Sequence, residues 1–108
     1  AWQERLAARG GWLVVDEAFI DATPQASLAA DAQRPGLVVL RSLGKFFGLA
    51  GARVGFMLAE AGLLDRMQEL LGPWTLNAPA RWLAIHALQD REWQAQMRKR
   101  QAIQTAAK

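Results

Sequence analysis

Two short runs of apolar residues mark the first forty positions of the chain. Residues 12–15 read Trp-Leu-Val-Val and residues 37–40 read Leu-Val-Val-Leu. Both runs are apolar throughout, which favours strands buried on both faces of a parallel sheet over half-exposed strands that alternate. About twenty residues separate them, with a short helix predicted over 27–32, and this is enough for a crossover between parallel strands. A third strand is predicted over 53–58, after a glycine-rich loop at 44–51.

The spacing of apolar residues changes after residue 60. The pattern is now that of an amphipathic helix, which Gly72-Pro73 should end, and we expect this helix to cover one face of the sheet. Its apolar stripe consists of Leu63, Leu64, Met67, Leu70 and Leu71.

Two further helices are predicted towards the C-terminus. Asn77 and Pro79 are typical of a helix start, and Asp90 is placed to cap a last, more polar helix. The apolar residues of these two helices are Trp82, Ile85, Leu88, Trp93 and Met97.

Strands followed by helices in this order indicate an α/β fold, in which ligands bind beyond the carboxyl ends of the strands. Asp16 follows the first predicted strand, and Ser42 and Lys45 follow the second. The order of elements therefore predicts that a carboxylate, a hydroxyl and an amine lie near one another.

Length and composition fit one small domain with a modest core, since 52% of the 108 residues are hydrophobic. The chain has no cysteine, which excludes disulfides and thiolate metal sites, and we expect no metal site. Its apolar runs are much shorter than the ~20 residues of a membrane span, and the N-terminus does not resemble a signal peptide. We therefore expect a cytoplasmic protein with no membrane partner.

The formal net charge of +3 comes largely from a basic stretch near the C-terminus, Arg98 to Arg100. No aromatic residues interleave with these charges, so we interpret the stretch as a solvated helix face and expect no nucleic-acid partner. The chain starts with Ala1, and residues 101–108 are helix-like without a stop signal. Both ends look cut.

Two motifs carry a family resemblance. Residues 42–55 read Ser-Leu-Gly-Lys-Phe-Phe-Gly-Leu-Ala-Gly-Ala-Arg-Val-Gly, and residues 14–19 read Val-Val-Asp-Glu-Ala-Phe. The first resembles the lysine motif of the class I and II aminotransferase superfamily, and the second resembles its aspartate motif. The resemblance implies an α/β chain from the large domain of a fold-type-I pyridoxal-phosphate enzyme, with a mostly parallel sheet and covering helices.

The same resemblance implies a role for four residues with pyridoxal 5'-phosphate as cofactor. Lys45 would form the Schiff base and later carry a proton at the substrate's Cα. Asp16 would pair with the pyridine nitrogen, while Ser42 and Arg53 would hold the phosphate. Relatives often have serine or threonine where this chain has Gly44, which removes one hydroxyl contact with the phosphate.

Residues 16–21 and 72–75 look most like threonine-phosphate decarboxylases, which are relatives of histidinol-phosphate aminotransferases. Relatives that transaminate usually have tyrosine in place of Phe19, whose ring cannot donate a hydrogen bond to the cofactor. The resemblance implies decarboxylation of O-phospho-L-threonine to aminopropanol phosphate in cobalamin biosynthesis. A histidinol-phosphate aminotransferase is the alternative enzyme, and a non-catalytic fragment that self-associates is the alternative of another class.

In intact members of the superfamily, further segments lie on both sides of the part matched here. Residues 1–108 are therefore expected to be part of the cofactor-binding large domain, with 91–108 starting the helix that leads to a small domain. The resemblance also implies a homodimer that acts on a small phosphorylated amino acid. Trp74 is a candidate for the wall of the active site, whereas we interpret His86 as a packed or partly exposed residue of a helix.

Overall fold

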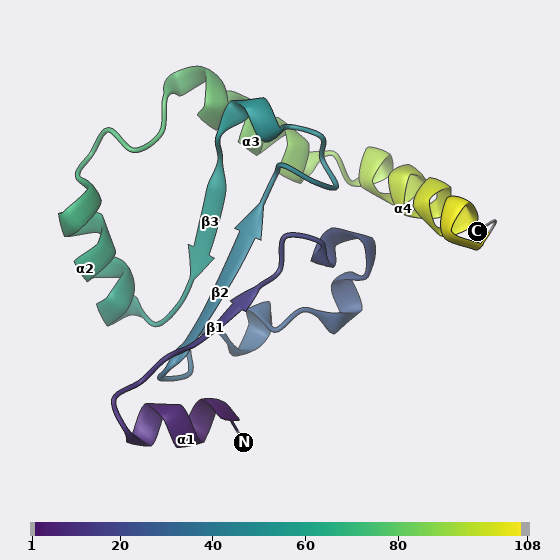
Figure 1. Cartoon of the computed structure of the whole chain (residues 1–108). Coiled ribbons are helices and arrows are strands. Elements are labelled where there is room, and N and C mark those ends of the chain that lie inside the picture. Colours follow the sequence, from purple (N-terminus) through teal and green to yellow (C-terminus); the bar gives the residue numbers. More distant parts are fainter. Residues whose placement is uncertain (1, 107–108) are drawn as a thin grey trace.

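The computed structural model describes residues 2–106 (Figure 1). One three-stranded sheet consists of β1 (Leu13–Asp16), β2 (Leu37–Ser42) and β3 (Gly55–Leu58), in this spatial order. The α-helices are α1 (Trp2–Ala8), α2 (Ala61–Leu71), α3 (Ala78–Gln89) and α4 (Arg91–Ala106). Four short 3₁₀ helices complete the fold: η1 (Ile20–Ala22), η2 (Pro24–Ala26), η3 (Ala29–Asp31) and η4 (Ala50–Ala52).

The directions of the strands bring three chain segments to one edge of the sheet. β1 and β2 are parallel, as predicted, and Asp16 lies opposite Leu40. β3 runs antiparallel to β2, with Gly55 opposite Ser42. The ends of β1 and β2 and the start of β3 therefore share one edge, and α1 lies at the other end of the sheet (Figure 1).

The crossover between β1 and β2 contains 3₁₀ turns where the sequence predicted a helix over 27–32. The buried Glu17 carboxylate accepts hydrogen bonds from Ser27 Oγ and from Leu28 N, each at 2.7 Å. Ser27 Oγ in turn accepts a hydrogen bond from Ala29 N at 3.1 Å. These bonds pair N–H groups at the start of η3, which remains a single 3₁₀ turn.

The predicted burial of the two apolar runs is confirmed for β2 and wrong for β1. Residues 37–39 are buried, and Val39 belongs to a core cluster that also contains Ala32. In β1, however, Val14 is 56% exposed, although its strand is paired with β2. Its residues alternate between partly buried and exposed.

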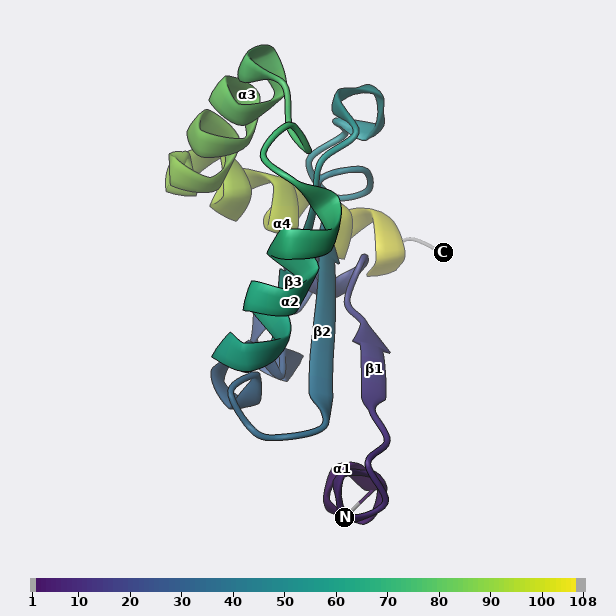
Figure 2. The same ribbon diagram turned by 90° about the vertical axis from the view of Figure 1, so that its left-hand side faces the viewer.

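The amphipathic helix α2 forms as predicted and ends at Gly72, whose φ of 77° suits glycine. The expectation that it covers a sheet face is wrong for this part of the chain, since none of its residues is buried and Leu70 is 81% exposed. Figure 2 shows α2 and α3 on one side of β2, with β1 on the other.

Both predicted caps of the later helices are confirmed. Asn77 Oδ1 accepts a hydrogen bond from Ala80 N at 2.8 Å and begins α3. Asp90 Oδ1 accepts one from Trp93 N at 3.1 Å in the first turn of α4. Within residues 2–106, no helix combines the length and the apolar character that crossing a membrane requires.

Candidate functional site

The loop between β2 and β3 surrounds a cavity of about 370 Å³. Pockets for small ligands begin at roughly this size, about 300 Å³. The wall comes from the end of β2, the loop and the entry to β3, and consists of Ser42, Gly44, Lys45, Leu49, Ala50, Arg53, Val54 and Gly55. The structure therefore brings together three of the four residues predicted for the site: Ser42, Lys45 and Arg53.

The charges around this cavity are of one sign. Among the described residues that line it, the charged ones are Lys45 and Arg53, and both are cations. Both side chains are exposed, so they can reach a ligand in the cavity. A guanidinium, an ammonium and the Ser42 hydroxyl form a donor set that suits an anion such as a phosphate group.

Ser42 is oriented by the backbone that follows it. Its Oγ accepts a hydrogen bond from Gly44 N at 2.9 Å, which leaves the hydroxyl hydrogen available to a ligand. Gly44 lies close to this oxygen, because a Cβ built at residue 44 would be 3.2 Å from Ser42 Oγ and 3.6 Å from Ala50 Cα. A side chain at residue 44 would therefore crowd the Ser42 hydroxyl.

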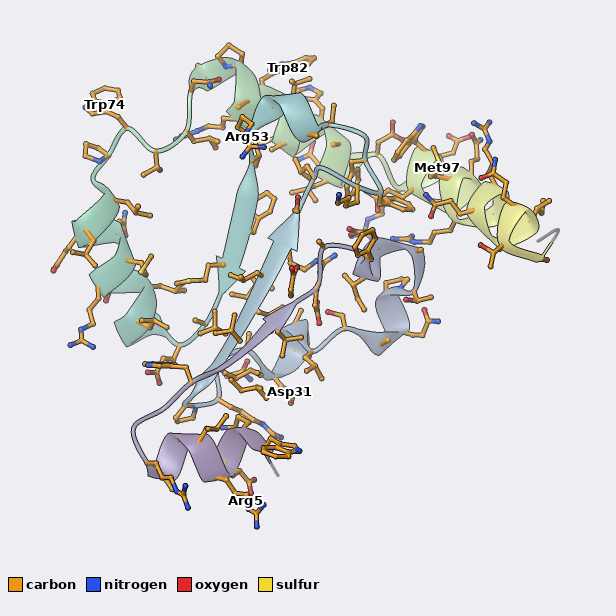
Figure 3. All side chains as sticks on the ribbon, viewed as in Figure 1. Arg5, Asp31, Arg53, Trp74, Trp82 and Met97 are labelled. Carbon is orange, nitrogen blue, oxygen red and sulfur yellow. The ribbon has the colours of Figure 1, made fainter. Side chains whose placement is uncertain are left out.

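Arg53 has an unusual backbone conformation for a residue with a side chain. Its φ of 55° and ψ of 50° lie in the left-handed region, where it ends the turn η4, and its N–H donates to Ala50 O at 3.3 Å. Among residues 2–106 it is the one non-glycine residue with positive φ. Residues with a Cβ enter this region at a cost, which marks the position as a candidate for function. Arg53 lies at the upper end of β3 in Figure 3.

The Lys45 loop is anchored by aromatic packing. Phe46 and Phe47 are buried in a core cluster that includes residues of α3, and both contact Trp93 of α4. Phe47 stacks on Trp93 with centroids 5.8 Å apart, and Phe46 meets Trp93 edge-on at 5.6 Å. The two phenylalanines thus fix the backbone on one side of Lys45, while the lysine side chain remains exposed.

Asp16 lies at the same sheet edge but outside the wall of this cavity. Its carboxylate is exposed, and Oδ1 accepts a hydrogen bond from Ala18 N at 3.0 Å. The next turn brings Phe19 to the lysine, with Lys45 Nζ 5.5 Å from the centre of the Phe19 ring. The Asp16 segment therefore meets the Lys45 loop through a cation–π contact.

Two buried carboxylates close to the site were not predicted as structural residues. Glu17 organises the crossover, and Asp21 accepts a hydrogen bond from Arg41 Nη2 at 2.6 Å within an ion pair. Asp21 is only 4% exposed, and its Oδ2 has no partner among the described residues. Arg41, directly after the apolar run at 37–40, was the sequence signal for an acidic partner, but the identity of that partner was not evident.

Two other residues considered from the sequence lie away from the cavity. Trp74 is 92% exposed and projects outward from the connection between α2 and α3 (Figure 3). It lines a separate depression with Trp82 and Ile85. His86 is exposed on α3, where Nδ1 lies 2.8 Å from Trp82 O and the ring lies against the Trp82 ring, in agreement with a packing role.

Comparison with known proteins identifies the family and the fold. The sequence model for the family "Aminotransferase class I and II" matches residues 2–107. The crystal structure of a histidinol-phosphate aminotransferase from Sinorhizobium meliloti in complex with pyridoxal-5'-phosphate superposes with a TM-score of 0.73 and 26% identity. This match covers 89% of the present chain and 28% of that chain, and it confirms the predicted fold class.

Curated relatives fall into two groups by name. The threonine-phosphate decarboxylase of Pseudomonas aeruginosa is 65% identical over 87% of this chain, and one from Sinorhizobium sp is 52% identical over 70%. Histidinol-phosphate aminotransferase 1 of Pasteurella multocida is 40% identical over 84%. The chain spans 28%, 23% and 26% of these three relatives, respectively.

Proposed function

Because the chain belongs to the class I and II aminotransferases, we propose that the full-length protein containing it binds pyridoxal 5'-phosphate with the residues around Lys45. The residues present fit this cofactor. Arg53 and the Ser42 hydroxyl hold its phosphate, and the lysine amine is available for its aldehyde. Gly44 provides no hydroxyl, so its contribution to an anion-binding turn is limited to its backbone.

Lys45 and Asp16 are proposed to act on different parts of the cofactor. When bound, the cofactor supplies an aldehyde and a ring that accepts electron density from the substrate. Lys45 would supply the amine for the aldehyde and would carry a proton at the substrate Cα. The Asp16 carboxylate holds the proton on the pyridine nitrogen, which keeps the ring electron-poor.

We propose decarboxylation of O-phospho-L-threonine to aminopropanol phosphate, a reaction of cobalamin biosynthesis, as the activity of the full-length protein. The observation that carries this proposal is the 65% identity to the threonine-phosphate decarboxylase of P. aeruginosa. Phe19 supports it, because the ring next to Lys45 has no hydroxyl to donate to the cofactor. The weaker similarity to histidinol-phosphate aminotransferases makes transamination of histidinol phosphate the second candidate.

We also propose that α4 begins the connection to a small domain and that the full-length protein is a homodimer. The sixteen-residue helix α4 has no buried residues, as expected of a helix that leaves the core. The exposed apolar side chains Trp74, Trp82 and Ile85 provide a surface for a second copy. Cytoplasmic localisation stays a prediction.

The test uses the full-length protein loaded with pyridoxal 5'-phosphate. Carbon dioxide released from O-phospho-L-threonine is counted for the wild type and for Lys45→Ala, and we expect release that vanishes in the variant. Transamination of histidinol phosphate with 2-oxoglutarate, without carbon dioxide release, would instead establish the second candidate. If the wild type neither binds cofactor nor turns over either substrate, the alternative of a non-catalytic, self-associating protein prevails.

A further inference from the structure

One side chain from the last helix touches both segments that form the candidate site. Arg98 of α4 donates a hydrogen bond from Nε to the Asp21 carbonyl oxygen at 2.6 Å, across 77 residues of sequence. Its guanidinium carbon also lies 5.4 Å from the centre of the Phe46 ring. Because Phe46 follows Lys45 directly, Arg98 connects the lysine loop to the segment that follows Asp16.

Asp21 is a rigid attachment point for this arginine. The Asp21 side chain is buried and forms an ion pair with Arg41 of β2 at 2.6 Å. Arg41 directly precedes Ser42 in the sequence. Its backbone carbonyl accepts the bond from Arg98. Asp21 is therefore fixed to the sheet through its carboxylate and to α4 through its carbonyl.

Phe46 is the second attachment point, and it is 6% exposed. Its ring contacts Phe47 edge-on at 5.1 Å and Trp93 at 5.6 Å, so α4 holds it with an aromatic ring and a cation. Trp93 packs against the cluster that contains Phe46 and Phe47, whereas Arg98 also binds the segment after Asp16. Together with the Arg41–Asp21 ion pair, Arg98 therefore holds the two segments in their relative position.

The two segments meet at the reactive amine. Lys45 Nζ lies over the Phe19 ring, and Phe19 is two residues before Asp21. A shift of the Asp21 segment relative to the loop would therefore move Phe19 relative to the amine.

We propose that Arg98 is a positioning residue for Lys45, which sets the place of the amine relative to Phe19. This inference rests on the proposed cofactor function. In the bond-forming step, Lys45 Nζ forms a C=N bond with the aldehyde carbon, and the aldehyde oxygen leaves as water. Arg98 favours this step by holding the backbone on both sides of the Lys45–Phe19 contact, but it does not line the cavity that takes the phosphate.

The test separates bond formation from phosphate binding in the full-length protein. Pyridoxal 5'-phosphate can bond to Lys45, whereas pyridoxine 5'-phosphate has an alcohol in place of the aldehyde and cannot. The bond between pyridoxal 5'-phosphate and Lys45, here called capture, is measured by borohydride reduction and mass spectrometry of the Lys45 peptide. Binding of pyridoxine 5'-phosphate is measured by calorimetry. We compare Arg98→Met with Arg100→Met, the same change at an exposed residue of α4.

We expect Arg98→Met to weaken capture of pyridoxal 5'-phosphate about tenfold, equivalent to about 1.4 kcal/mol, with pyridoxine 5'-phosphate binding within about twofold of wild type. Arg100→Met should change neither. Arg98→Lys keeps a cation but lacks the Nε–H group, so it should show an intermediate loss, and it replaces the methionine variant if that fails to fold. Equal losses for both ligands, or no loss of capture, would overturn the positioning role.

A ligand-free measurement keeps this inference separate from the proposed function. If wild type binds neither compound, the cofactor proposal fails, and hydrogen exchange then decides on Arg98. Arg98→Met should speed exchange in residues 20–23 and 45–48 together, relative to Arg100→Met. Unchanged exchange in either segment would refute the connection.

Discussion

Arg53 allows the cost of its backbone conformation and its contribution to ligand binding to be tested at one position. We consider Arg53→Gly and Arg53→Ala in the full-length protein. Both remove the guanidinium from the cavity, but only glycine adopts a φ of 55° without steric cost. The comparison of the two variants therefore isolates the backbone from the side chain.

The stability difference follows from two opposing contributions. The left-handed conformation costs a residue with a Cβ about 1–2 kcal/mol. Glycine avoids this cost, but it makes the unfolded chain more flexible, which lowers stability by about 0.4–1 kcal/mol relative to alanine. We expect Arg53→Gly to be more stable than Arg53→Ala by about 0.5–1 kcal/mol, measured by urea unfolding without ligand.

Affinity for a phosphate ligand should fall equally in the two variants. Hydrogen bonds to a charged group contribute about 1.5–3 kcal/mol, so affinity for inorganic phosphate should fall about tenfold to a hundredfold in both. Arg66→Ala on the exposed surface of α2 is the control for a general loss of positive charge. Equal stability of the two Arg53 variants would refute the strain argument, and wild-type phosphate affinity in Arg53→Ala would refute the phosphate site.

Two further predictions concern stability and are measured by urea unfolding. Gly36→Ala should cost about 2–4 kcal/mol, because φ is +79° and the new Cβ would lie 2.8 Å from Ala7 Cβ. Gly48→Ala, with φ of +67° and no described atom within 4 Å, should cost only about 1 kcal/mol; equal costs would exclude the steric contribution. Arg41→Met should cost about 3 kcal/mol and more than Asp21→Asn, because it leaves a buried carboxylate without its cation. A larger loss in Asp21→Asn would contradict this account.

Local sequence patterns predicted the parts of the fold that depend on neighbours along the chain. The short apolar runs that form β1 and β2 and the caps at Asn77 and Asp90 follow from such patterns. The gathering of Ser42, Lys45 and Arg53 follows from their shared loop. These features require no knowledge of which distant segments pack together.

The features that the sequence did not predict depend on distant contacts. The predicted helix over 27–32 is only the turn η3, and the bonds of Glu17 to residues about ten positions away hold its start. The contact of Arg98 with Asp21 has no local signal at all, and a basic stretch was interpreted as a solvated face. The exposure of Val14 and of α2 depends on which elements lie beside them, which spacing alone does not reveal.

The reversal from β2 to β3 has a consequence for how the site assembles during folding. Ser42, Lys45 and Arg53 are joined by a single short loop, so the phosphate-binding half needs only contacts that are close in sequence and inexpensive in chain entropy. Asp16 reaches the same edge only after the crossover has closed, and Arg98 arrives from the end of the chain. Affinity for phosphate should therefore arise during folding before the lysine and the aspartate take up their final relative positions.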